Sequence, residues 1–352
     1  MPKVAVVPGD GVGKEVTREA VKALRAVTAG TDLELDLVEW PHGADRYLET
    51  GEAITDAEFH DLRSNYQAIL LGALGDARVA GNEHARQILL GMRFKLDLYV
   101  NFRPVRLFHE RLTPLRDKGV DDVDMAIFRE NTEGVYVGMG GTFKQGTPDE
   151  VAIQEDVNTR KGVERIIRAA FEWARANGKT RVTMSDKANA MEFAGGLWRR
   201  VFKLVSAEYP EIESEALYVD MLAMDMVRRP ERYQVIVTGN LFGDILSDLG
   251  AQLAGGLGLS PSGNIHPGRI GLFEPVHGSA PDLAGRDLAN PFAAILTSGL
   301  MLEHLGRPEL GKRLEDAVRD CIVAGETTAD LGGTLGTVAS GDAVVRRLTA
   351  VS

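Results

Sequence analysis

The chain has 352 residues, 44% of them apolar and 26% charged, a composition typical of a soluble globular protein long enough for two domains. Its 40 Lys and Arg against 51 Asp and Glu give a net charge of −11, which argues against nucleic-acid binding because phosphate-backbone binders need a basic surface. The single cysteine, Cys321, excludes an internal disulfide and a cysteine-based zinc site, and its apolar helix-like surroundings indicate a packing role.

The sequence shows no sign of a membrane segment or a secretory leader. No apolar run reaches the roughly 18 residues that a membrane-spanning helix needs. The N-terminus lacks the basic start and long apolar core of a signal peptide. We therefore expect a cytoplasmic protein.

The first predicted strand, residues 4–7, is followed by glycines at positions 9, 11 and 13 and by a helix-like run over 14–29. This order is the setting of a dinucleotide-binding turn, and Glu39 ends the next strand about where a ribose-binding carboxylate would stand. The spacing, however, is G-x-G-x-G instead of G-x-G-x-x-G, and Asp10 would place a negative charge beside a pyrophosphate. We interpret the segment as a tight strand-to-helix turn and seek the cofactor site elsewhere.

Strand-like and helix-like runs alternate along the chain, which predicts an α/β protein with a mainly parallel sheet. The strand-like runs are VAVVP, LELDLVEW, YQAILLGA, LDLYVNF, VDMAIF, RVTMSD and YQVIVTGN. Two alternating runs between 134 and 158 predict a long hairpin or arm. Residues 250–268 are rich in Gly and Pro and predict a loop region or domain crossing, whereas the chain after 291 is expected to be helical.

The segment YQVIVTGNLFGDILSDLG, residues 233–250, predicts a strand followed by a helix. Asp244 and Asp248 are four residues apart and therefore share one face of that helix. Ile245, Leu246 and Leu249 are expected to face the other way. The spacing alone leaves two interpretations open: a solvated helix face, or an oxygen-ligated Mg²⁺ or Mn²⁺ site.

Other charged residues stand just past apolar runs. Arg93 closes a helix-like run, and four more residues follow predicted strands: Arg103, Arg129, Lys187 and Asp220. The ends of strands are where open α/β sheets gather ligand sites. Three guanidiniums suit a substrate with two carboxylates, which arginine binds in bidentate fashion.

Nearly the whole chain resembles the β-decarboxylating dehydrogenases, the isocitrate/isopropylmalate dehydrogenase family. The motifs that carry the resemblance are PGDGVGKE, LxxxR…NFRPVR, FRENTEGVY, SDKANAM, VDMLAMDMV, GNLFGDILSDLG and LFEPVHGSAPDLAG. It implies a two-domain isopropylmalate-dehydrogenase-like α/β fold, with a mixed, mostly parallel sheet that is not Rossmann and an active-site cleft between the domains. Residues 1–101 and 254–352 would form the first, NAD-binding domain, and residues 102–253 the second, with a dimerisation arm at about 134–158.

The same resemblance implies roles for the charged residues. Arg93, Arg103 and Arg129 would hold the carboxylates of a malate-type substrate. The ligands of a Mg²⁺ or Mn²⁺ ion would be Asp220, Asp244 and Asp248. Lys187 would be the base near the C2 hydroxyl and Tyr136 the proton donor. Lys187 and Asp220 would each act in the active site of the partner subunit. A homodimer with shared active sites is therefore expected.

The resemblance implies that NAD binds to Glu274 and to residues 276–291, VHGSAPDLAGRDLANP. Asp282 would bind the ribose hydroxyls and Asn290 would lie near the adenine. Since Asp282 would repel a 2′-phosphate, NAD is favoured over NADP. The full set of expected cofactor residues is Glu274, His277, Gly278, Ser279, Ala280, Asp282 and Asn290.

Substrates of this family differ in the group on C3, which the helix before Arg93 contacts. Gln87 and Leu89 stand where bacterial isocitrate enzymes carry Ser and Asn, and Leu90 stands where homoisocitrate enzymes carry Arg. Leu89 and Leu90 resemble the apolar pair that meets an isopropyl group, and an extra carboxylate against them would remain unpaired. The resemblance thus favours oxidative decarboxylation of 3-isopropylmalate to 2-oxoisocaproate with NAD, a step of leucine biosynthesis.

Alternatives remain. Arg86 stands where isopropylmalate enzymes commonly carry Glu near the nicotinamide, and Asn131 and Lys14 resemble the D-malate and tartrate branch. That branch is the first alternative, followed by homoisocitrate and isocitrate dehydrogenase. A dicarboxylate-binding regulatory subunit is the non-enzymatic alternative. Degenerate subunits lose a metal Asp, the Lys or the Tyr, and this chain keeps all of them.

Overall fold

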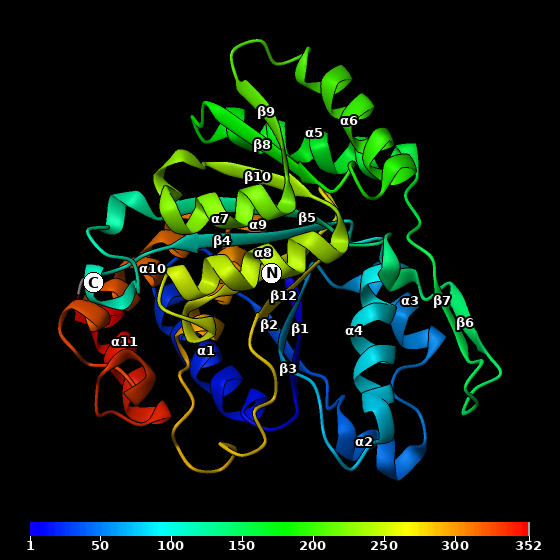
Figure 1. The fold of residues 1–352 in the computed structure, drawn as a ribbon. Helices are drawn as coiled ribbons and strands as arrows, with labels where there is room; N and C mark the ends of the chain where they lie inside the picture. Colours follow the sequence, from blue (N-terminus) through cyan, green and yellow to red (C-terminus); the bar gives the residue numbers. More distant parts are fainter. Residues whose placement is uncertain (351–352) are drawn as a thin grey trace. The chain divides into compact units, whose positions relative to one another are not determined.

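The computed structural model describes residues 1–350, which form two compact units that we describe separately (Figure 1). Unit 1 contains Met1–Leu98, Arg106–Val120 and the chain from Ala251 onward. Unit 2 contains Tyr99–Val105 and Asp121–Gly250. The segment Arg106–Val120, which the sequence placed in the second domain, therefore packs with unit 1.

The sheet strands of unit 1 lie in the order β2 (Asp36–Glu39), β1 (Lys3–Gly9), β3 (Ala68–Ala73), β12 (Gly271–Pro275) and β11 (Pro261–Ile265). β1 is parallel to β2 and β3, and β3 is parallel to β12. Only the β11–β12 pair among them is antiparallel. The mixed, mostly parallel sheet that the sequence predicted is confirmed.

Helices cover both faces of this sheet. They are α1 (Gly13–Thr28), α2 (Ala44–Thr50), α3 (Asp56–Asn65), α4 (Glu83–Lys95), α9 (Phe292–His304), α10 (Pro308–Val323) and α11 (Thr337–Ala350). Val4 and Leu70 pack with α1, α9, α10 and α11, whereas their neighbours Ala5 and Ile69 pack with α3 and α4. This alternation explains why the strands read as continuous apolar runs, since both faces of the sheet are buried. Cys321 lies fully buried in the first of these cores, so its packing role is confirmed.

The sheet strands of unit 2 lie in the order β4 (Val100–Arg106), β5 (Asp124–Glu130), β10 (Val235–Thr238), β8 (Arg181–Asp186) and β9 (Glu213–Tyr218). β10 is parallel to both β5 and β8, and β8 is parallel to β9. The carboxyl ends of β5, β10, β8 and β9 therefore share one edge. The helices are α5 (Arg160–Ala176), α6 (Glu192–Ser206), α7 (Val219–Arg228) and α8 (Asn240–Leu253).

The predicted arm is present as the antiparallel pair β6 (Gly140–Phe143) and β7 (Val151–Gln154), whose residues are all exposed (Figure 1). Short 3₁₀ helices occur at η1 (Ala80–Asn82), η2 (Glu110–Leu112), η3 (Val120–Asp122), η4 (Val135–Val137), η5 (Pro230–Arg232), η6 (Leu257–Leu259) and η7 (Ala329–Leu331). Within the described residues, no helix has the length and apolarity that crossing a membrane requires.

The predicted loop at 250–268 is wrong in its middle, because residues Pro261–Ile265 form β11. Pro261 is the first residue of the strand, the position at which a missing N–H costs least. At Gly263 a Cβ would lie 3.1 Å from the ring of Phe273 on the neighbouring strand. The Gly and Pro that suggested a loop thus reflect a strand start and a close approach to an aromatic ring.

Candidate active site

The glycine turn after β1 packs against the segment predicted to bind NAD. The backbone N–H of Val12 donates to the carbonyl of Ser279 over 2.9 Å. Gly11 has φ +52°, and a Cβ there would lie 2.1 Å from the same carbonyl oxygen. The backbone of Ser279 therefore occupies the space beside the turn where a phosphate would bind. This agrees with a tight structural turn.

Asp10, inside this turn, is a buried acceptor that joins three segments of unit 1. Its Oδ1 accepts from the N–H of Ala44 at 2.7 Å, and its Oδ2 accepts from the N–H of Gly75 at 2.9 Å. Nε2 of His84 lies 2.8 Å from Oδ2, and His84 is fully buried on α4. Asp10 thus fixes α4, the helix that carries Arg93.

Arg93, at the end of α4, is 6% exposed and pairs with Glu274 of β12 through Nη2 and Oε1, 2.9 Å apart. Asn264 donates to the same carboxylate oxygen at 2.9 Å. The Nε of Arg93 is buried and has no hydrogen-bond partner among residues 1–350. A fixed guanidinium with a donor left over is suited to a carboxylate ligand. Glu274, expected at the cofactor, is in this structure the partner of a predicted substrate residue.

Leu89 and Leu90, one turn before Arg93, are half-buried. Leu89 packs partly against the core that α4 shares with α3. Arg86, one turn earlier, is 67% exposed at its side chain and reaches Glu83 only at 4.0 Å. The two leucines therefore present apolar surface on the helix that carries Arg93.

In unit 2, Arg129 leaves the end of β5 and is 1% exposed. Its Nε donates to Oδ1 of Asn240 at 2.9 Å, and its Nη1 contacts Oδ1 of Asp244. A Cβ at Gly243 would lie 2.6 Å from the Cβ of Arg129, so only glycine fits this turn of α8. The hydroxyl of Tyr136 donates to Oδ2 of Asp244 at 3.0 Å.

Arg103 of β4 contacts the same face of α8. Its Nη1 donates to Oγ of Ser247 at 2.6 Å and lies 3.4 Å from Oδ1 of Asp248. Its Nη2 lies 3.5 Å from Oδ1 of Asp244, and its Nε donates to Asn101 at 2.8 Å. The structure therefore brings five of the predicted residues together within unit 2: Arg103, Arg129, Tyr136, Asp244 and Asp248.

Asp244 and Asp248 share one face of α8, as their spacing predicts, with side chains 38% and 55% exposed. Burial raises the pKa of Asp248, Asp244 raises it further, and Arg103 and Arg129 oppose the shift. Of the apolar residues expected to face away from the two carboxylates, Leu246 is fully buried, whereas Ile245 is 55% exposed. Ile245 instead follows the exposed Leu241 by one turn and continues its apolar surface.

Lys187 and Asp220 form a second cluster in unit 2. Lys187 follows β8, and Asp220 is in the first turn of α7, directly after the neighbouring strand β9. Nζ of Lys187 lies 2.5 Å from Oδ1 of Asp220, and this hydrogen bond is the main cause of the lowered pKa of Asp220. No group of three His, Cys, Asp or Glu side chains within residues 1–350 is arranged to hold a metal ion.

The predicted NAD segment combines exposed and buried polar groups. Gly278 and Asp282 are exposed, whereas Ser279 is buried and Ala280 is half-buried with φ +36°. His277 has Nδ1 3.0 Å from the carbonyl oxygen of Gly278, and its Nε2 is buried without a partner in the described chain. Burial lowers the pKa of His277, so its ring is neutral at pH 7.

Asn290 is 8% exposed, and both ends of its amide are engaged. Its Nδ2 donates to Oδ2 of Asp330 at 2.9 Å, and its Oδ1 accepts from the N–H of Phe292 at the same distance. Asp330 lies 40 residues away in sequence, so no local pattern indicates that it neighbours Asn290. The sequence also missed Asn101, Asn240 and Ser247, which orient the arginines. Only Ser247, three residues after Asp244 on one helical face, carried a usable signal.

Unit 2 gathers arginines, paired carboxylates and a lysine near strand ends, and unit 1 holds the buried Arg93; side chains of these kinds bind acidic small molecules. The chain belongs to the isocitrate/isopropylmalate dehydrogenase family, whose model matches residues 3–344. The family implies a small dicarboxylate substrate, NAD and a divalent metal.

Curated relatives cover nearly the whole chain. A 3-isopropylmalate dehydrogenase of Thermobifida fusca is 47% identical over 348 residues, which is 98% of this chain and 97% of the relative. A 3-isopropylmalate dehydrogenase of Leifsonia xyli subsp. xyli is 49% identical over 330 residues, 92% of this chain and 91% of the relative.

Solved structures share the fold. The isocitrate dehydrogenase from Methylococcus capsulatus has a TM-score of 0.89 and 38% identity, covering 99% of this chain and 100% of that one. A β-decarboxylating dehydrogenase from Thermococcus kodakarensis has a TM-score of 0.81 and 36% identity, covering 100% of this chain and 97% of that one.

Proposed function

We propose that this protein is an NAD-dependent, metal-dependent decarboxylating dehydrogenase that converts 3-isopropylmalate to 2-oxoisocaproate. The observation that carries the proposal is the apolar pair Leu89 and Leu90 one turn before the buried Arg93. The near-full-length relatives named 3-isopropylmalate dehydrogenase support it. An isopropyl group would contact the leucines, whereas a carboxylate there would lose its hydration without gaining a partner.

NAD is the proposed cofactor, bound along the segment from His277 to Asn290. The buried and unpartnered Nε2 of His277 supplies a free polar group, and the exposed carboxylate of Asp282 is available to ribose hydroxyls. Asp282 would repel a 2′-phosphate, which supports NAD over NADP. The backbone of Gly278, Ser279 and Ala280 would line the remainder of the adenosine site, and Glu274 would act through Arg93.

The donor set of Asp244 and Asp248 fits Mg²⁺ or Mn²⁺, which prefer carboxylate oxygens, and both side chains remain partly exposed. Residues 1–350 hold no group of three such side chains, so a third protein carboxylate would have to come from outside this cluster. We propose that Asp220 of the partner subunit completes the set. When bound, the metal polarises the C2 hydroxyl and stabilises negative charge during decarboxylation.

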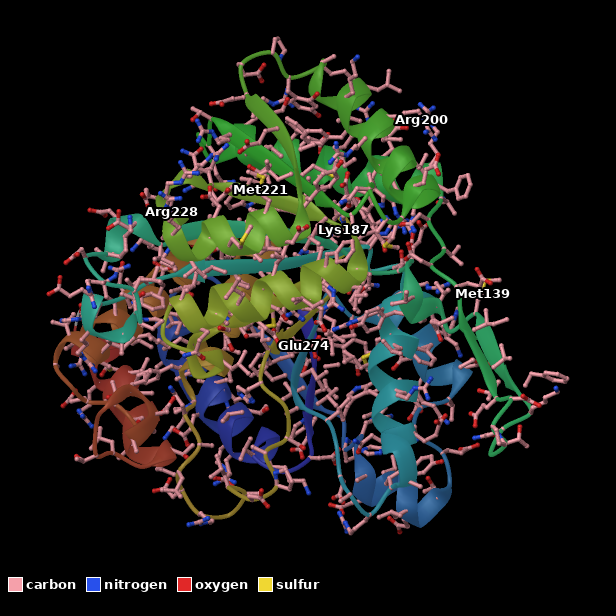
Figure 2. All side chains as sticks on the ribbon, viewed as in Figure 1. Met139, Lys187, Arg200, Met221, Arg228 and Glu274 are labelled. Carbon is pink, nitrogen blue, oxygen red and sulfur yellow. The ribbon has the colours of Figure 1, made fainter. Side chains whose placement is uncertain are left out.

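A homodimer is proposed on the apolar surface of α7 and α8. The exposed large apolar side chains there lie at helical spacing and are 39–68% exposed: Met221, Met224, Val227, Leu241 and Ile245. The arm adds Met139, Phe143, Val151 and Ile153, each at least 47% exposed (Figure 2 labels Met139 and Met221). Soluble monomers rarely expose so many large apolar side chains within one unit, so a second copy of the chain is the occupant we propose.

Separate residues of the chain would bind the substrate, accept a proton and donate a proton. Arg93, Arg103 and Arg129 would bind the two carboxylates and fix C2 and C3 of the substrate. Lys187 would accept the proton of the C2 hydroxyl, and bound NAD would supply the hydride acceptor. Tyr136 would return a proton to carbon after CO₂ leaves. Its hydroxyl already donates to Asp244, which places the donor beside the proposed metal.

Measuring NADH and CO₂ formed from 3-isopropylmalate, before and after metal removal, tests the proposal. One NADH and one CO₂ per substrate, abolished by chelation and restored by Mg²⁺ or Mn²⁺, are expected. Tight binding of the dicarboxylate without turnover would favour the regulatory-subunit alternative instead. NADH without CO₂ would contradict the decarboxylation step.

A further inference from the structure

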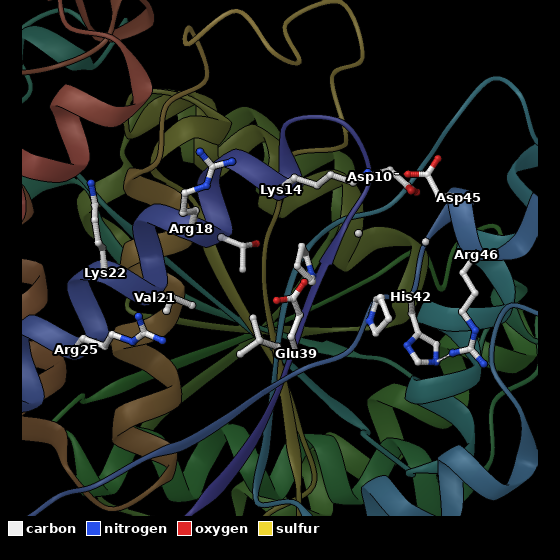
Figure 3. A pocket seen from close by; sticks show the side chains of 16 residues that line it. Asp10, Lys14, Arg18, Val21, Lys22, Arg25, Glu39, His42, Asp45 and Arg46 are labelled. Atoms are coloured by element: carbon white, nitrogen blue, oxygen red, sulfur yellow. Dashed lines mark hydrogen bonds and ion pairs between the residues drawn. The ribbon is translucent and has the colours of Figure 1, made fainter.

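Unit 1 contains a pocket of about 610 Å³ that the proposed reaction does not use (Figure 3). All of its lining residues lie between Val6 and Arg46, and none belongs to the segment proposed for NAD. It opens beside Gly9 and Glu39, the last residues of the parallel strands β1 and β2. The carboxyl ends of neighbouring parallel strands are where open α/β sheets bind ligands, and the volume suits a small molecule.

One wall is the basic face of α1, formed by Lys14, Arg18, Lys22 and Arg25 at helical spacing. Nζ of Lys14 already pairs with Asp45 at 2.8 Å, and Nζ of Lys22 pairs with two carboxylates at 2.5 Å. Arg18 and Arg25 make no ion pair within residues 1–350. Two guanidiniums without carboxylates on one helical face suit a phosphate group.

The opposite wall offers groups for a different part of a ligand. The exposed carboxylate of Glu39 and the guanidinium of Arg25 turn toward the middle of the pocket (Figure 3). The ring of His42 is 3% exposed and stacks on Trp40 at 5.0 Å. Nδ1 of His42 is buried and has no hydrogen-bond partner in the described chain. Apolar surface comes from Val6, Pro8, Val21 and Pro41.

We propose that this pocket binds a nucleoside phosphate, at a site separate from that proposed for NAD. Arg18 and Arg25 bind the phosphate, and the carboxylate of Glu39 accepts hydrogen bonds from the ribose hydroxyls. Glu39 ends β2, lines the pocket and is exposed, so its carboxylate is available to these hydroxyls. The glycine turn is filled by Ser279 and carries Asp10, so the phosphate binds to side chains of α1 instead of to that turn.

Calorimetric titration of the full chain with AMP, in the presence of saturating NAD⁺, tests this site. AMP is expected to bind while NAD⁺ is bound, and Arg18→Ala/Arg25→Ala is expected to weaken that binding by about 30-fold. The conservative pair Arg18→Lys/Arg25→Lys should keep most of the affinity. The matched control is Arg200→Ala, an exposed arginine of α6 that should change nothing.

Glu39→Gln separates the ribose contact from the phosphate contact. It is expected to weaken AMP binding about fivefold while leaving inorganic phosphate unchanged. AMP displaced by NAD⁺, with affinity unaffected by the double alanine variant, would overturn the proposal. Phosphate binding as tightly as AMP, with no effect of Glu39→Gln, would also overturn it. NAD⁺ affinity is read in a separate titration, so failure of the cofactor assignment is distinguished from failure of this site.

Discussion

Nζ of Lys187 lies 2.5 Å from Oδ1 of Asp220, at the ends of the neighbouring strands β8 and β9. The two side chains are 28% and 59% exposed, and they form a cluster of their own beside the one around Asp244. Lys187, the proposed base, and Asp220, a proposed metal ligand, are held together as one pair, so both could act in the active site of a partner subunit. We therefore expect two incomplete half-sites in each chain to form complete sites in a dimer.

Mixing inactive variants tests this sharing. Lys187→Ala and Asp244→Ala chains should each be inactive as homodimers, whereas a mixed dimer can place both lesions in one site and leave the other intact. After random subunit exchange of equal amounts, activity should return to about a quarter of the wild-type value. Exchange is verified by native mass spectrometry. Proven heterodimers without activity would count against shared sites.

Leu90 is expected to set the preference for the C3 substituent. Leu90→Ala removes apolar contact with an isopropyl group and should lower kcat/KM for 3-isopropylmalate by about 10- to 100-fold. D-malate, which has no group there, should be affected far less. Lys95→Ala, at the exposed end of α4, is the matched control and should leave the ratio of the two substrates unchanged. Equal losses on both substrates would show that Leu90 acts through folding alone.

Tyr136 should act in a proton-transfer step and contribute little to substrate affinity. Tyr136→Phe removes the hydroxyl that donates to Asp244 but keeps the ring that stacks 5.1 Å from the Arg129 guanidinium. A loss of about 100-fold or more in kcat with little change in KM is expected. Steady-state kinetics at saturating NAD⁺ give both constants. A raised KM at unchanged kcat would make Tyr136 a binding residue.

Cys321 should make stability depend on alkaline pH. Burial raises the pKa of its thiol to about 11, whereas the unfolded chain releases this proton near pH 9. Between these values the folded state binds more protons, so the free energy of unfolding falls as pH rises, by up to about 3 kcal/mol. Urea unfolding at pH 8 and pH 10 measures the first part of this fall, about 1 kcal/mol. Cys321→Ala should reduce it, and an unchanged pH dependence would contradict the assignment.

Local patterns in the sequence predicted most of the elements. The apolar runs of β1, β3 and β10 indicated strands because both faces of these sheets are covered, and the four-residue spacing placed Asp244 and Asp248 on one face of α8. Contacts between residues far apart in the sequence left no local pattern from which to predict them. Asn290 meets Asp330, and Arg93 meets Glu274, across 40 and 181 residues, so neither pair follows from spacing. The exposure of Ile245 could not be predicted either, because an apolar residue in a helix gives the same sequence pattern in a core and on a surface.

The identity of the substrate is tested most directly by comparing kcat/KM between the candidate substrates. NAD⁺ reduction with Mg²⁺ or Mn²⁺ would be measured on 3-isopropylmalate, D-malate, tartrate, isocitrate and homoisocitrate under one set of conditions. We expect kcat/KM for 3-isopropylmalate to exceed that of the others by at least about tenfold, because it alone presents a branched apolar group to Leu89 and Leu90. A lead for D-malate, or for either tricarboxylate, would contradict it.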